Sequence, residues 1–102
     1  MAWYIKKEVF TNKAENMSLP KRQSFVKKHK EWVLELKKSG YKIFSGYLVD
    51  IHKVPGGGGL LLLEEKSFKS ALSIVKKDPM ILAGLVNWKL HEWISISGDL
   101  DF

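Results

Sequence analysis

Residues 41–65 read YKIFSGYLVDIHKVPGGGGLLLLEE. Aromatic and β-branched residues dominate Tyr41–Ile51, and a short apolar run fills Leu60–Glu65, so both segments are expected to be strands. The proline- and glycine-rich segment Val54–Gly59 between them is expected to be a loop. The sequence therefore predicts an antiparallel hairpin in the middle of the chain. Ser45-Gly46 interrupts its first strand and indicates a bulge or the close approach of another group.

Helical patterns flank this hairpin on both sides. Before it, Ser18 or Leu19 is expected near the cap and Pro20 in the first turn, and apolar residues then recur at helical spacing as far as Ser39. After it, a second helix opens near Ser67 and stops at Asp78-Pro79. Each helix therefore lies between the hairpin and one end of the chain.

Strands are expected at both ends. Ala2–Phe10 is rich in aromatic and β-branched residues, and Leu85–Ile96 alternates between apolar and polar residues, while the polar tail Ser97–Phe102 is expected to be loosely held. The order is β-α-β-β-α-β, which is the ferredoxin-like α+β arrangement of a four-stranded antiparallel sheet with both helices on one face. The other face would expose Trp93, Leu85 and alternate residues of the second strand. A homodimer that packs sheet against sheet is the simplest way to cover it.

Length and composition limit the classes of protein. A chain of 102 residues that is 45% hydrophobic and 12% aromatic is expected to form one domain over residues 1–102. The absence of cysteine excludes disulfides, a thiolate nucleophile and cysteine-ligated metals, and a cytoplasmic location is the default expectation. The longest apolar run is Leu60–Leu63, and residues 1–10 lack the apolar centre of a signal peptide. We therefore expect a soluble, unprocessed protein without a membrane segment.

The net charge of +6 raises the question of an anionic partner. Most of the basic excess lies in residues 1–42, where the solvated face of one helix accounts for it. The sequence has sixteen lysines but only one arginine, Arg22, and the recognition of bases and phosphates favours arginine. A nucleic-acid partner is therefore not expected.

Two residues are candidates for acid–base chemistry. His29 lies on the apolar stripe of the first helix, where a lone histidine is more often a hydrogen-bonded core residue, although a pKa of about 6.5 suits proton transfer. Asp78 either caps a turn before Pro79 or takes part in chemistry. The three histidines lack metal-ligand spacing, so neither a metal nor a cofactor is expected.

Two other motifs carry little functional signal. Gly56–Gly59 matches neither the dinucleotide-binding pattern nor the P-loop, which leaves a flexible hairpin loop or a loop that approaches a ligand. No serine lies in a GxSxG elbow, so the sequence gives no support to a hydrolase triad.

Beyond these patterns, the chain resembles the YCII-related family over nearly its whole length. The resemblance is strongest at Asp78–Gly84 (DPMILAG) and at the helix-borne His29, and it extends through Trp32, Leu36, Gly40, Ser45-Gly46-Tyr47, Gly56–Leu60 and Trp88–Trp93. It implies a dimeric α+β barrel with a cleft that holds a His/Asp pair proposed to be catalytic. Carried over by position, the pair is His29 and Asp78, and Ser45 and Gly46 line the cleft.

Together these observations predict a small homodimer that binds a small organic ligand in a cleft between the first helix and the sheet. In this hypothesis His29 is the general base or acid, and Asp78 orients or charges it. Two alternatives stay open: a non-catalytic ligand-binding or accessory module with a purely structural pair, and a binder of anions or nucleic acid.

Overall fold

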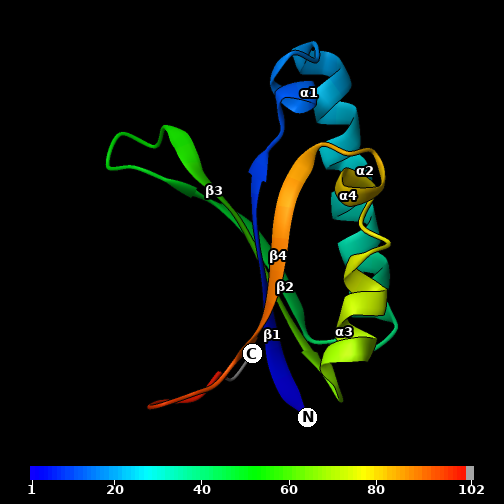
Figure 1. Cartoon of the computed structure of the whole chain (residues 1–102), viewed down its shortest axis with the longest axis vertical. Coiled ribbons are helices and arrows are strands. Elements are labelled where there is room, and N and C mark those ends of the chain that lie inside the picture. The colour runs from blue at the N-terminus through cyan, green and yellow to red at the C-terminus, as the bar shows by residue number, and fades with distance from the viewer. Residues whose placement is uncertain (101–102) are drawn as a thin grey trace.

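The computed structural model describes residues 1–100 and contains one four-stranded sheet with helices on one side (Figure 1). The strands follow the order β2-β3-β1-β4, and every neighbouring pair is antiparallel. This confirms the predicted α+β fold. The elements are β1 (Ala2–Phe10), α1 (Asn12–Glu15), α2 (Leu19–Lys38), β2 (Ile43–Val49), β3 (Pro55–Glu65), α3 (Phe68–Val75), α4 (Pro79–Leu82) and β4 (Val86–Trp93).

Local sequence explains where the helices begin and end. The Ser18 side chain accepts a hydrogen bond from the N–H of Lys21 at the start of α2, and Ser67 caps α3 in the same way through Ser70. Gly40, with φ of 97°, ends the turn after α2 in a conformation that suits glycine. No described helix is both long enough and apolar enough to cross a membrane.

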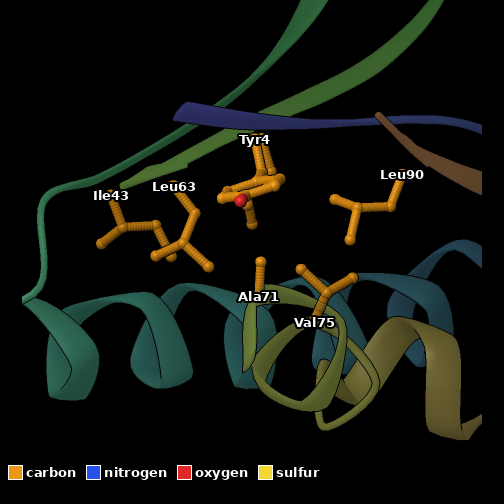
Figure 2. Packing of buried hydrophobic residues seen from close by; sticks show 7 residues of the cluster. Tyr4, Ile43, Leu63, Ala71, Val75 and Leu90 are labelled. Atoms are coloured by element: carbon orange, nitrogen blue, oxygen red, sulfur yellow. The ribbon is translucent and has the colours of Figure 1, made fainter. Parts of the chain in front are cut away.

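The main core lies between the sheet and the helices. In Figure 2, Tyr4, Leu63 and Leu90 point from the strands toward Ala71 and Val75 of α3. All five side chains are buried. Because side chains alternate along a strand, the same alternation points Lys6 and Ser45 toward the helices as well.

Both predicted ends of the last strand are wrong, because β4 spans Val86–Trp93 and not Leu85–Ile96. Ile96 is almost fully exposed, because the pairing of Trp93 with Trp3 leaves β1 only two further residues with which to extend the ladder. Leu85 does not lie on the second sheet face but is fully buried in a smaller core with Met80. The predicted tail continues past residue 100, so its end lies outside the described residues.

The glycine run is part of a strand and not a loop. Pro55 and Gly59 pair with β2, and the chain turns instead at residues 50–54, where the Asp50 carboxylate accepts hydrogen bonds from two backbone N–H groups. A side chain on Gly58 would lie 2.5 Å from the carbonyl oxygen of Glu8, and one on Gly57 would lie 2.6 Å from Leu48. The glycines therefore allow β3 to pass close to its neighbours. The ladder's irregularity lies after Tyr47, and not at Ser45-Gly46 as predicted.

Candidate acid–base site

A buried lysine lies at the base of the site. The Lys6 side chain is 0% exposed, and its ammonium contacts Asp78 Oδ2 at 2.7 Å and Glu8 Oε1 at 2.6 Å. Sequence reasoning missed this residue because a lysine in a strand is ordinarily exposed. The alternation of Tyr4, Lys6 and Glu8 on one strand face is the signal that could have found it.

Asp78 is held from three directions. Its side chain is fully buried and caps α4 by accepting the N–H of Met80 at 2.9 Å. It also accepts the ammonium of Lys6, and His29 Nδ1 lies 2.9 and 3.0 Å from its two oxygens. The capping interpretation and the functional interpretation of Asp78 therefore describe the same carboxylate.

The surroundings of Asp78 favour its ionised form. Burial by itself would raise the pKa of this carboxyl, but the hydrogen bond with His29 and the positive charge of Lys6 outweigh burial and lower the pKa below its ordinary value. Asp78 is therefore a carboxylate at neutral pH. It can only accept hydrogen bonds in that state.

The charged carboxylate fixes the orientation of the histidine. His29 projects from α2 with its side chain 14% exposed, and its ring lies 5.8 Å from that of Trp32. Because Asp78 only accepts, the neutral imidazole must carry its proton on Nδ1. This leaves the lone pair on Nε2, which lies 2.8 Å from the hydroxyl oxygen of Ser45. The histidine therefore directs its basic atom, Nε2, toward the partly exposed Ser45.

The structure brings three of the four predicted site residues together and separates the fourth. Asp78, His29 and Ser45 come from the start of α4, from α2 and from β2, and they form one hydrogen-bonded chain. Gly46 is the next residue on β2, and the alternation of the strand points it to the opposite face of the sheet. Open space lies where its side chain would be.

The two hollows found on the described surface lie away from the hydrogen-bonded residues Asp78, His29 and Ser45. Two open hollows of about 560 and 580 Å³ are lined mainly by residues of the opposite sheet face and the β2 edge, such as Phe44 and Leu62 in the first and Leu48 and Asn87 in the second. Neither lining includes His29, Ser45 or Asp78. Within residues 1–100, no group of three or more His, Cys, Asp or Glu side chains is arranged to hold a metal ion.

Two solved structures with the same fold illustrate the similarity. One is 5-chloro-2-hydroxyhydroquinone dehydrochlorinase (TftG) from Burkholderia phenoliruptrix AC1100, in complex with 2,5-dihydroxybenzoquinone: it is 20% identical, with a TM-score of 0.64, over 90% of this chain and 93% of that one. The other is At3g17210 from Arabidopsis thaliana, 13% identical with a TM-score of 0.53 over 98% of this chain and 100% of that one. A comparison with curated protein sequences finds no significant match.

The sequence itself shows the family. Residues 7–94 match the YCII-related domain, and this range contains His29, Ser45 and Asp78. The match covers well over half of the chain, so the protein belongs to the YCII-related domain family.

Proposed function

We propose that this protein is a homodimer that binds a small organic ligand beside His29 and Ser45 and moves a proton on that ligand. His29 Nε2 is the general base or acid, and Asp78 orients and charges the ring. The observation that carries the proposal is the contact of His29 Nδ1 with both oxygens of the buried Asp78 carboxylate, at 2.9 and 3.0 Å. A ring held in this way keeps Nε2 in a fixed position for proton transfer.

The burial of the charges supports an acid–base role. Asp78 is fully buried, so its negative charge is poorly screened where it meets the imidazole. An imidazolium formed by proton uptake at Nε2 is stabilised by that carboxylate. Lys6 offsets part of this negative charge and keeps Asp78 ionised. His29 can therefore accept a proton and release it again.

The class of ligand is suggested by the similar fold of TftG, whose structure holds 2,5-dihydroxybenzoquinone. Such a molecule is small, oxygen-rich and flat, and it carries ring C–H groups next to carbonyl and enol carbons. These C–H hydrogens can exchange with solvent by protonation and deprotonation of carbon. For this chain we propose a ligand of the same chemical class, a small enolic or hydroxylated carbonyl compound.

The homodimer part of the proposal is supported by the sheet face opposite the helices. Phe44 is 62% exposed, and Val9, Leu48 and Trp93 on the same face are also exposed. The strand alternation places all four on the side away from α2 and α3. An apolar sheet face of this extent is typical of a protein interface, and a second copy offers the same residues in return.

Proton transfer can be tested with 2,5-dihydroxybenzoquinone as the probe. We expect the protein to bind it in calorimetry and to accelerate exchange of its ring hydrogens for deuterium in heavy water, followed by proton NMR. His29→Gln should lower the exchange rate by about 100 to 10,000-fold while the protein stays folded. His52→Gln is the matched control, because His52 lies exposed in the turn between β2 and β3.

Asp78→Asn tests whether the two residues act as a unit. Asparagine can still cap α4, so this variant keeps the structural role of Asp78. Its loss of exchange should overlap with that of His29→Gln in the double variant instead of adding to it. Exchange at the unaltered rate in folded Asp78→Asn protein would remove the His/Asp proposal. Binding of the probe without any exchange would favour the non-catalytic binding module.

A further inference from the structure

Ser45 occupies the position of a nucleophile in a three-residue hydrogen-bonded chain. The Asp78 carboxylate holds His29 Nδ1, and His29 Nε2 lies 2.8 Å from Ser45 Oγ. A nucleophilic serine needs a base within hydrogen-bonding distance and a third group that orients the base. All three are present, although they lie on separate elements and no GxSxG elbow marks them in the sequence.

The direction of the hydrogen bonds agrees with this role. With the imidazole proton on Nδ1, the lone pair of Nε2 can only accept, so the Ser45 hydroxyl must be the donor in the 2.8 Å contact. The proton of the serine therefore already points at the group that would remove it. A serine that merely accepted a hydrogen bond from the ring would require a proton on Nε2, either in the opposite tautomer or in the imidazolium.

The strand geometry offers a second requirement, a hydrogen-bond donor for an oxyanion. β2 is an edge strand within residues 1–100. The bond from the N–H of Glu64 to the carbonyl of Lys42 fixes which residues of β2 face β3. Alternation along an antiparallel ladder then turns the backbone N–H of Ser45 toward the free edge of the sheet. A nucleophile's own backbone N–H serves as an oxyanion donor in serine hydrolases.

Solvent exposure increases along the hydrogen-bonded residues from the Asp78 carboxylate to the Ser45 hydroxyl. Asp78 and Lys6 are fully buried, whereas His29 and Ser45 are each partly exposed. The charges that set up the base are therefore kept from water, while the hydroxyl stays open to a ligand from solvent.

We propose that Ser45 is an acyl-accepting nucleophile that gives this protein hydrolytic activity toward small carboxylic esters. Ser45 Oγ attacks the carbonyl carbon while His29 Nε2 takes the hydroxyl proton. The tetrahedral adduct expels the alkoxide, which takes that proton from Nε2 and leaves as the alcohol. Water then attacks the acyl-serine with His29 as base, and the carboxylic acid and free Ser45 are released. The sum is ester plus water giving acid plus alcohol.

The test uses a fluorophosphonate, which phosphonylates activated serines with loss of fluoride, and p-nitrophenyl acetate as the ester. We expect peptide mass spectrometry of the unaltered protein to find the phosphonyl group on Ser45, and nitrophenolate release to show a burst. Ser45→Ala should lose the label and the burst and hydrolyse the ester at least about 100-fold more slowly. Ser24→Ala should behave as the unaltered protein, because Ser24 lies exposed on α2 and its hydroxyl bonds only the carbonyl of Lys21.

Dependence on the base completes the test. His29→Gln should abolish labelling of Ser45, because an amide cannot take the proton. A folded protein whose Ser45 stays unlabelled would overturn the proposal, as would equal labelling in His29→Gln or acetylation confined to lysines. The position of the label in the unaltered protein decides the question even if a variant fails to fold. This activity goes beyond the proposed proton transfer and is tested without a carbon acid, so either can fail alone.

Discussion

Lys6 and Asp78 are 72 residues apart in sequence, yet their side chains form a 2.7 Å ion pair with both groups fully buried. The pair joins β1, one of the two central strands of the sheet, to the start of α4. Through Asp78 it also reaches His29, the base of the proposed site. The electrostatics of the site therefore depend on Lys6, which acts on the histidine through Asp78.

Replacing Lys6 should therefore cost more than an ordinary lysine substitution. Lys6→Met leaves the Asp78 carboxylate buried without its cation, and we expect a loss of about 3 kcal/mol in the free energy of unfolding. Lys69→Met, at an exposed position of α3, should change it by less than about 0.5 kcal/mol. Urea unfolding at one fixed protein concentration measures both values. Equal losses in the two variants would contradict the stabilising role of the buried pair.

The lowered pKa of Asp78 predicts how stability responds to acid. As the pH falls below about 4, Asp78 becomes protonated in the unfolded chain but stays ionised in the folded protein. The free energy of unfolding therefore decreases. This contribution is complete above the unfolded pKa and is lost as the pH falls through the folded pKa. Asp78→Asn lacks it, so its stability difference from the unaltered protein should shrink on acidification.

Urea unfolding between about pH 5 and pH 3 tests this prediction. The exposed Asp99 supplies the control, because Asp99→Asn should differ from the unaltered protein by an amount that changes little with pH. A difference between Asp78→Asn and the unaltered protein that stays constant over the same range would show that Asp78 has an ordinary pKa.

The open face of the sheet predicts the assembly state. Trp93 is 43% exposed there, and Trp93→Glu would place a charge in the proposed apolar interface. Sedimentation at micromolar concentration should give a dimer for the unaltered protein and a shift toward the monomer for Trp93→Glu. Gln23→Glu adds the same charge on the exposed surface of α2 and should stay dimeric. A monomeric mass for the unaltered protein would end the dimer proposal.

The order and type of the main elements could be predicted from the sequence because hydrophobic periodicity is a local signal. The helix caps at Ser18 and Ser67 were also predictable, since a cap acts within one turn. Strand ends were not: β4 stops where β1 runs out of residues to pair, which is a property of two segments far apart in the chain. The same reason explains the glycine run, whose close contact with Glu8 and Leu48 exists only in the folded sheet.

For the candidate site, periodicity placed His29 on the inward stripe of its helix, and the Asp-Pro step marked Asp78. The family resemblance paired these two residues and added Ser45. The burial of Lys6 was not predicted because a lysine in a strand is ordinarily exposed, and its burial requires acidic partners that the fold supplies. The hydrogen bond between Ser45 and His29 was not predicted for a similar reason, since it joins α2 and β2, whose packing no local sequence pattern encodes.

The central claim is that Asp78 holds the His29 ring with its proton on Nδ1 and its lone pair on Nε2. Long-range proton–nitrogen correlation NMR of the ¹⁵N-labelled protein, above the pH at which the ring is protonated, reads the tautomer directly. We predict that His29 carries its proton on Nδ1, and that Asp78→Asn shifts the population toward the Nε2–H tautomer. A ring protonated on Nε2 in the unaltered protein would contradict the claim, because Nε2 could then neither accept a proton from a ligand nor take one from Ser45.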